Sequence, residues 1–346
     1  MRAERQNGMA RQRCIPLDSP AEWKEALVGI GHAFSHTWEN CYAMHLTTGF
    51  RTSLYCFEAE NVRIVCPIAE REFDGHIDIV TPFGFSGFAG NKDYPEFPRY
   101  WRNFVKEGGY VCGYIALHPR FENSTYFDPN ESYSTNSLYF LDLTLSLDQI
   151  FANLDRNRKR QLKKWEELAS GFILDKSVLT EFLVTNYTDF IRGMKASPAN
   201  YFSMETLRFL CGLDNVFMVG TGTRGRIEAV YVFAYTAEVA ECLFNVALPE
   251  GRRYTTALLW FGLNRMMSFK VPLLNLGGGV REDDSIAGSK QRFGSRKVPF
   301  RCLKQIYRPK KYEELCRQAN ADRAGLDGYF PAYRSSRHRE PTPRRD

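Results

Sequence analysis

Residues 239–276, "VAECLFNVALPEGRRYTTALLWFGLNRMMSFKVPLLNL", decide the fold of this chain. The first ten are rich in apolar and β-branched residues and predict a strand, 239–248. The segment 252–270 then carries apolar residues at helical spacing. A second short apolar run follows and ends in glycines. A strand, a crossover helix and a further strand in this order predict that the two strands are parallel neighbours.

The same order of elements occurs twice along the chain. Each half reads as two helices, three strands, a helix, a strand, a connection and a last strand, and we place the first strand of the second half at 172–179. Three strands joined by short turns predict an antiparallel meander. The fold class is therefore α/β with mixed sheets, in two tandem copies of one unit, joined by a long amphipathic helix over 147–170.

Composition limits the classes of protein that fit. The 346 residues are 44% hydrophobic and carry a formal charge of +6, which suits an anionic ligand but is too small to indicate duplex DNA. No apolar run is long enough for a membrane span, the charged start is unlike a secretory signal, and nine scattered cysteines fit reduced thiols. A cytoplasmic location is expected.

Five segments divide the chain. We expect tails at 1–14 and 321–346, the second of which is basic and would offer a weak contact to a membrane surface or another anionic partner. The first domain would be 15–146, on the acceptor side, the linking basic helix 147–170, and the second, catalytic domain 171–320.

The order of elements resembles the GNAT acyltransferase fold, in which the sheet parts between two parallel strands to hold an acyl donor. Ordinary members place a glycine-rich turn for the pyrophosphate of coenzyme A where this chain has "PEGRRYTTALL", with only Gly251 retained. Because side chains at the other turn positions would obstruct a backbone cradle, acetyl-CoA is disfavoured.

Three motifs resemble the Fem-type peptidyltransferases and their FemAB-like relatives, which carry two GNAT-like domains. They are "TPFGFSGFAG" (81–90), the basic run "NRKRQLKKWEE" and "LNLGGGVREDDSIAGSKQRFG" (274–294), where Ser289 replaces an aromatic residue of the family's motif. The resemblance implies transfer of an acyl or aminoacyl group to an amine of a cell-envelope or polysaccharide precursor. It allows aminoacyl-tRNA or an acyl-CoA or acyl-carrier thioester as donor, with no permanently bound cofactor.

The last motif supplies the first candidate site residues. Gly277, Gly278 and Gly279 permit close backbone approach, and Lys290 would neutralise charge on the attacked carbonyl. Arg292 and Phe293 follow it as candidate binding residues. A plain strand-to-helix turn without a ligand is the alternative.

Two further residues are candidates for the chemistry. Tyr254, where the helix begins, would donate a proton to the leaving group, or else would simply pack inward. Asn245 and the backbone beside it are expected on a strand bulge, where amides can donate to an oxyanion.

Cations and aromatic residues suggest where substrates bind. Arg158, Arg160 and Lys163 lie in a run without interleaved acids, which favours a phosphate of a sugar or peptide precursor or of a tRNA; a solvated helix face is the alternative. Tyr201 and Phe83 are candidate lining residues, or core residues.

A metal site is not expected, because three nearby His and Cys residues do not share a helix face and lack a fourth ligand. The alternative function is a non-catalytic binding protein for an anionic glycan or nucleotide on the same double scaffold.

Overall fold

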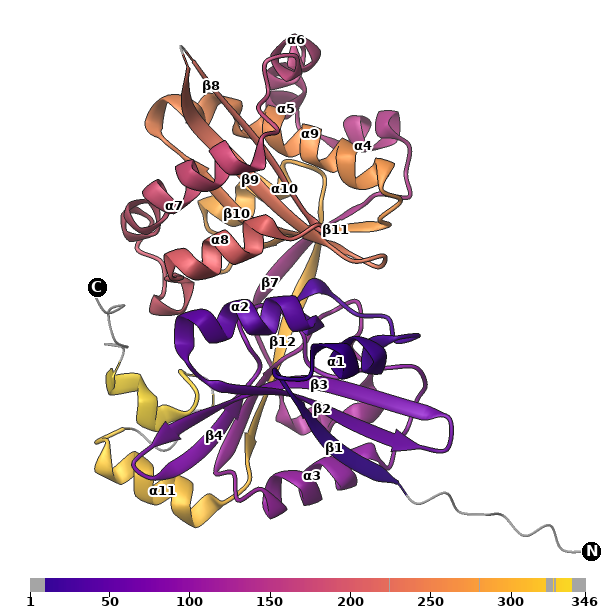
Figure 1. The fold of residues 1–346 in the computed structure, drawn as a ribbon, viewed down its shortest axis with the longest axis vertical. Helices are drawn as coiled ribbons and strands as arrows, with labels where there is room; N and C mark the ends of the chain where they lie inside the picture. Colours follow the sequence, from indigo (N-terminus) through magenta and orange to yellow (C-terminus); the bar gives the residue numbers. More distant parts are fainter. Residues whose placement is uncertain (1–9, 224, 280, 322–325, 327, 338–346) are drawn as a thin grey trace, which may run out of the picture. The chain divides into compact units, whose positions relative to one another are not determined.

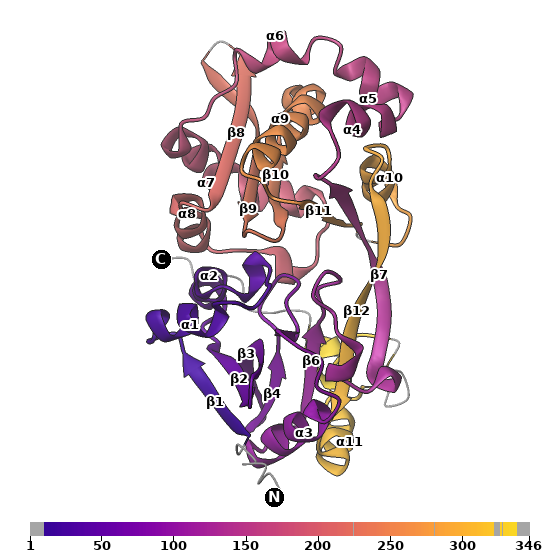
Figure 2. The same cartoon turned by 90° about the vertical axis from the view of Figure 1, so that its right-hand side faces the viewer.

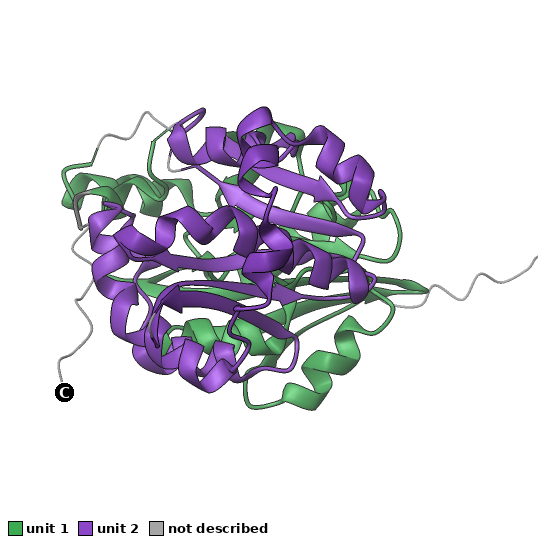
Figure 3. Ribbon diagram, turned by 90° about the horizontal axis from the view of Figure 1, so that it is seen from above, with its two compact units in different colours: residues 1–135, 301–346 green, residues 136–300 purple. Residues whose placement is uncertain are grey.

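The computed structural model describes residues 10–223, 225–279, 281–321, 326 and 328–337 (Figure 1). The chain forms two compact units, shown in different colours in Figure 3. Unit 1 takes Met1–Thr135 and Arg301–Asp346, and unit 2 takes Asn136–Phe300. The chain passes from one unit to the other within two strands, β7 (Ser132–Asp142) and β12 (Arg296–Ile306).

Unit 1 is a mixed sheet with helices on both faces. Its strands lie in the order β1-β2-β3-β4-β6-β12, with β5 on β3; β2, β3 and β4 are antiparallel neighbours, and β4 and β6 are parallel. Besides β12, its elements are β1 (Arg11–Pro16), α1 (Pro20–Leu27), η1 (Phe34–His36), α2 (Trp38–Thr48), β2 (Arg51–Ala59), β3 (Val62–Phe73), β4 (His76–Val80), β5 (Ala89–Gly90), α3 (Phe97–Glu107), β6 (Cys112–Ala116), η2 (Ser124–Tyr126), η3 (Pro129–Glu131), α11 (Pro309–Gln318) and η6 (Ala332–Arg337).

The two faces of this sheet follow from the alternation of side chains along β2. Leu54 and Cys56 are buried with residues of α1 and α2, whereas Tyr55 and Phe57 are buried with the aromatic residues of α3. Because successive side chains of a strand point to opposite faces, a continuous apolar run is what a strand covered on both sides requires.

Unit 2 repeats this arrangement. Its strands lie in the order β7-β11-β10-β9-β8, where β8, β9 and β10 are antiparallel and β10 and β11 are parallel. Besides β7, its elements are α4 (Leu147–Asn153), α5 (Arg156–Gln161), α6 (Trp165–Ala169), α7 (Lys176–Gly193), η4 (Pro198–Asn200), α8 (Met204–Gly212), β8 (Val216–Thr223), β9 (Arg226–Tyr235), β10 (Ala240–Ala247), η5 (Pro249–Tyr254), α9 (Thr255–Ser268), β11 (Leu273–Gly278) and α10 (Ser285–Gln291).

The core of unit 2 lies between its sheet and α9. Ala229, Tyr231 and Phe233 of β9 are buried on this side, and Gly262 allows α9 to lie directly against the ring of Phe233. Helix α7 packs on the opposite face, where the Tyr187 ring meets the edge of a buried ring on β10. The predicted fold class, mixed α/β with two repeated units, is confirmed.

The single long helix predicted over 147–170 is wrong. The segment forms α4, α5 and α6 instead, because Leu154 is extended and buried and Asp155 begins a new helix by accepting a hydrogen bond from the Arg158 N–H. The predicted strand at 172–179 is also wrong beyond its first residues, since Asp175 caps α7 through the amides of Ser177 and Val178.

Residues of both predicted tails take part in the described structure of unit 1. Residues 11–16 form β1, which pairs with β2 and buries Ile15, so the tail predicted over 1–14 is wrong for 11–14, and residues 1–9 lie outside the described part. In the other tail Tyr333 is buried, and its hydroxyl and the Arg334 Nε–H both donate to the buried Asp78 carboxylate, at 2.9 and 2.8 Å.

The two units do not follow the predicted domain boundaries of 15–146 and 171–320. Residues 302–306 of β12 pair with β6, so this part of the strand and α11 belong to unit 1. Residues 138–142 of β7 pair with β11, so that strand belongs to unit 2. Each unit therefore completes its sheet with a strand that sequence order assigned to the other.

Candidate functional site

Strands β10 and β11 part soon after they begin. They pair only through Ala240 with Leu274 and Glu241 with Asn275, although β10 continues to Ala247. Over the described residues, no strand pairs with the inner edge of β10 beyond Glu241. Its backbone amides and carbonyls there are left for another partner, as the resemblance led us to expect.

Lys290 brings an amine to the place where these strands part. It lies on α10, whose first turn is capped by the Asp284 carboxylate, and its Nζ donates to the Gly278 carbonyl at the end of β11, at 2.6 Å. The amine also interacts electrostatically with Cys242 of β10. Burial lowers the pKa of Lys290 to about 8, against the opposing effects of Cys242 and Asp284.

The three glycines of the turn have different reasons to be glycine. Gly277 has a φ of +75°, and a Cβ there would lie 3.2 Å from the Lys290 amine. A Cβ on Gly278 would lie 2.9 Å from the Ser137 carbonyl oxygen, and one on Gly279 would lie 2.5 Å from Asp284 Oδ1. Gly278 and Gly279 therefore serve a tightly packed turn, and only Gly277 makes room for the amine.

Asn245 lies on β10 beyond the parting of the strands. The irregularity of this strand falls between Cys242 and Phe244, so the prediction that Asn245 lies on the bulge is wrong by one to two residues. Asn245 pairs with Tyr231 of β9, and its Nδ2 donates to the Tyr231 hydroxyl at 2.7 Å. Its Oδ1 is buried without a hydrogen-bond partner in the described structure.

Arg158 points into unit 2 and ties two helices together. Its Nη1 donates to Thr256 Oγ1 of α9 at 2.5 Å, and its Nη2 donates to Ser289 Oγ of α10 at 2.6 Å. The guanidinium carbon lies 4.9 Å from the centre of the Phe293 ring, and electrostatic interaction with Tyr231 connects it to the Asn245 pair. Burial lowers the pKa of Arg158, but a guanidinium remains charged.

The structure thus gathers several predicted residues in unit 2 and leaves others apart. Arg158, Asn245, Gly277, Lys290 and Phe293 are joined directly or through one shared partner. Four partners of these residues were not predicted as site residues: Tyr231, which both Asn245 and Arg158 contact, Cys242 beside Lys290, and Thr256 and Ser289, which accept from Arg158. The alternation of β9 places Tyr231 beside Ala229 and Phe233 on one face, a signal that was available in the sequence.

Gly278 also contacts this group, since its carbonyl accepts the Lys290 hydrogen bond, and the Arg292 guanidinium interacts electrostatically with Arg158. The remaining candidates are exposed or half-buried. Arg160 and Lys163 are exposed, and Arg292 is exposed beside Asp155 at 4.0 Å. Tyr254 is half-buried just before α9, under the Arg253 guanidinium at 4.6 Å, and packs against the core as its alternative interpretation expects. Tyr201 is half-buried after η4.

Phe83 belongs to unit 1, where its side chain is 44% exposed. Gly251, the one glycine kept at the turn before α9, has a packing reason: a Cβ there would lie 2.2 Å from the Glu228 carbonyl oxygen of β9. This glycine therefore does not indicate a pyrophosphate cradle.

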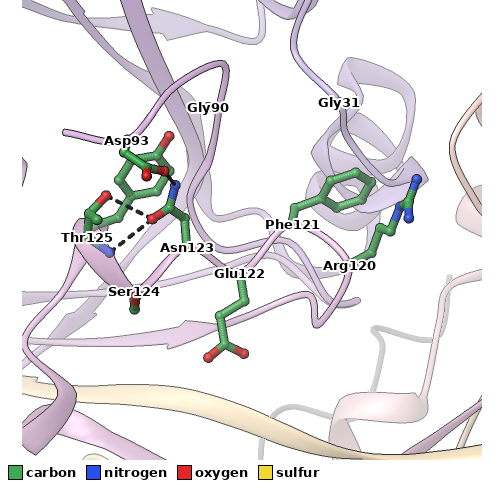
Figure 4. Close-up of a pocket in the computed structure, with 10 residues that line it drawn as sticks. Gly31, Gly90, Asp93, Arg120, Phe121, Glu122, Asn123, Ser124 and Thr125 are labelled. Atoms are coloured by element: carbon green, nitrogen blue, oxygen red, sulfur yellow. Dashed lines mark hydrogen bonds between the residues drawn. The ribbon is translucent and has the colours of Figure 1, made fainter.

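A separate hollow lies in unit 1 and is shown in Figure 4. It has a volume of about 450 Å³ and is lined by exposed or half-buried polar groups such as Asp93, Arg120 and Ser124. Asn123, also on its wall, donates to Asp93 and accepts from Thr125. None of the residues predicted from the sequence lines it.

Within the described ranges, no group of three or more His, Cys, Asp or Glu side chains is placed to hold a metal ion. No helix in the same ranges is both long and apolar enough to cross a bilayer.

The sequence matches no protein-family profile and no curated protein. Solved structures do match. FemX has a TM-score of 0.63 at 7% identity, over 88% of this chain and 99% of that one. The C-terminal domain of a protein described as a lysylphosphatidylglycerol synthetase from Agrobacterium fabrum scores 0.55 at 13% identity, over 86% and 97%. L-PGS from Bacillus licheniformis scores 0.53 at 9% identity, over 83% and 92%.

Identities this low establish the fold alone. The chain has the fold of FemX and of these two other proteins, which agrees with the Fem-type resemblance of its motifs.

Proposed function

We propose that this protein is a transferase that moves an acyl or aminoacyl group from an ester or thioester to an amine. The observation that carries the proposal is the amine of Lys290 at the point where β10 and β11 part. A half-buried cation beside a strand edge that β11 no longer pairs suits a carbonyl whose oxygen gains negative charge.

The reaction needs no covalent enzyme intermediate. The nitrogen lone pair of the acceptor amine attacks the carbonyl carbon, and the carbonyl π electrons move to oxygen. The tetrahedral species then collapses, the bond to the leaving oxygen or sulfur breaks with its electron pair, and the proton lost by nitrogen goes to the leaving group through solvent. Lys290 as an ammonium, and backbone N–H groups of β10 near Asn245, stabilise the oxyanion.

The proposed donor is an aminoacyl ester or an acyl thioester, and coenzyme A is its disfavoured carrier. Gly251 is explained by its packing against β9, and the neighbouring Arg252 and Arg253 are exposed side chains where a pyrophosphate cradle would need bare backbone. A structural neighbour described as a lysylphosphatidylglycerol synthetase names a lysyl group, which fits an aminoacyl donor.

The proposed acceptor is an amine on a phosphate-bearing sugar or peptide precursor of the cell envelope. Arg160 and Lys163 are exposed cations on and after α5, and we assign them to the phosphate. Arg158 is assigned a different role, because its Nη1 and Nη2 are already bound to Thr256 and Ser289.

The test is transfer itself. The purified chain is incubated with a mixed pool of aminoacyl-tRNA, or with acyl-CoA, together with nucleotide-linked amino sugars and peptides, and products are detected by mass spectrometry. Lys290→Met should lower kcat by about 100- to 1,000-fold. Lys310→Met, at an exposed site on α11, is the matched control and should leave the rate unchanged.

A binding protein would behave differently. If the parent chain transfers nothing to any amine yet retains an anionic glycan or nucleotide, and Lys290→Met weakens that binding, the transferase proposal is refuted in favour of binding on the same scaffold.

A further inference from the structure

Helix α10, which carries Lys290, is short and is contacted from outside by Asp155 and Arg158. Helix α10 has only seven residues, Ser285–Gln291, and short helices are marginal unless tertiary contacts hold them. Its first turn is held by Asp284, which accepts from the amides of Ile286 and Ala287. The half of the helix that carries Lys290 needs support of another kind.

That support comes from the corner between α4 and α5. The Asp155 N–H donates to the Arg292 carbonyl at 2.9 Å, directly at the end of α10. Gly294 follows with a φ of +72°, and a Cβ there would lie 2.6 Å from the Asn153 carbonyl oxygen. Figure 2 shows α4, α5 and α10 in the same part of unit 2. The corner therefore closes tightly on the end of α10.

Arg158 extends this contact to the residue beside Lys290. Its Nη2 donates to Ser289 Oγ at 2.6 Å and lies 3.4 Å from the Ser289 carbonyl oxygen, and its Nη1 donates to Thr256 Oγ1 of α9. The guanidinium also lies over the Phe293 ring. A planar fork with fixed donors holds two partners in one geometry, which a flexible ammonium does not.

We infer that Arg158 is a positioning residue that acts through Ser289 to hold the Lys290 amine at the parting of β10 and β11. The inference rests on the proposed role of Lys290, because positioning matters only if that amine acts on a substrate. It replaces the expectation that Arg158 binds a phosphate. An amine displaced by about 1 Å from its working position costs about 100-fold in rate.

The experiment reads the position of Lys290 without using activity. Lysines of the full chain are reductively methylated with ¹³C-formaldehyde, and each methyl resonance is titrated by NMR; the Lys290 signal is the one missing from Lys290→Arg. In the parent its midpoint is expected near pH 8. Arg158→Lys keeps the positive charge but loses the planar guanidinium that reaches both Thr256 and Ser289. Ser289→Ala removes the hydroxyl that accepts from Arg158 and leaves the charge unchanged.

Both variants should raise the Lys290 midpoint by more than one pH unit as the amine moves into water, and Arg156→Met, at an exposed site on α5 with no assigned role, should not. An unchanged midpoint in both variants would overturn the inference. Arg158→Met is included because a rise there, without a rise in Arg158→Lys or Ser289→Ala, would reveal a charge effect alone and also overturn it.

Kinetics then separate this inference from the proposed function. With a donor that the parent uses, Arg158→Lys should lower kcat about 10- to 100-fold while KM for the acceptor changes less than twofold. A rise in KM alone would instead return Arg158 to phosphate binding. If no donor is used but the midpoints still shift, the proposed function fails and the positioning of Lys290 stands.

Discussion

Burial of Lys290 should make unit 2 less stable than it would be without the charge. Moving the pKa of Lys290 from its ordinary 10.5 to about 8 corresponds to a penalty of about 3 kcal/mol on the charged form at pH 7. Lys290→Met keeps the length of the side chain and removes the charge. We therefore expect the free energy of unfolding of unit 2 to rise by about 2–3 kcal/mol at pH 7.

The free energy of unfolding of the parent should rise with pH because the pKa of Lys290 is lower in the folded protein than in the unfolded chain. Between pH 8 and 10.5 the folded protein has released the Lys290 proton while the unfolded chain keeps it, so the parent gains stability as pH rises through this window. The advantage of Lys290→Met should accordingly shrink from pH 7 to pH 10. Below pH 8 the penalty is present in full.

The assay is urea unfolding followed by hydrogen exchange of the β9 amides, which reports unit 2 alone. Lys310→Met is the control at an exposed lysine and should match the parent at both pH values. The reasoning is refuted if Lys290→Met differs from the parent by the same amount at pH 7 and at pH 10, since the difference would then not come from a buried charge.

Three other substitutions test separate features. Gly277→Ala should lose transfer activity and about 1–2 kcal/mol of stability, because its φ is +75° and the new methyl would meet the Lys290 amine. Gly49→Ala, with a φ of +66° and open space around it, should lose stability alone. Asp78→Asn should lower the free energy of unfolding of unit 1 by about 3–5 kcal/mol in urea, because the buried Arg71 guanidinium loses its carboxylate partner. It should also expose the C-terminal segment to protease, since Arg334 loses the same partner. Asp189→Asn, at an exposed site, should change neither property. Burial lowers the pKa of His118 to about 3, so the free energy of unfolding of unit 1 should fall by about 1.4 kcal/mol per pH unit below about pH 6.5. His118→Gln should make this fall less steep, and equal slopes in both proteins would show that His118 does not cause it.

Much of the fold could be predicted because periodicity reports burial. The apolar runs of 239–248 and 252–270 correctly predicted the strand β10 and the helix α9. The breaks in 147–170 could not be predicted in the same way: the apolar spacing continues through Leu154 and Leu162, but each is buried by turning inward at a helix end. Local capping by Asp155 outweighs the helical period there.

The candidate site was predictable in part for a related reason. The glycines and Lys290 lie within one short stretch of sequence, so they could be predicted together from that stretch alone. The partners of Arg158 could not, since Thr256 and Ser289 lie 98 and 131 positions away in the chain. Nothing in the basic run distinguishes the one arginine that turns inward from its exposed neighbours Arg160 and Lys163, because that direction depends on tertiary contacts.

The passage of the chain between the units, in β7 and β12, has a consequence for synthesis on the ribosome. Unit 2 is continuous, so all of its strands and helices are available once residue 300 has been made. Unit 1 must wait with β6 unpaired on one edge until residues 302–306 emerge, and with Asp78 lacking two of its partners until Tyr333 and Arg334 follow. The unit whose synthesis begins first is therefore the unit completed last. Truncation from the carboxyl end should destabilise unit 1 before it removes any residue of the proposed site in unit 2.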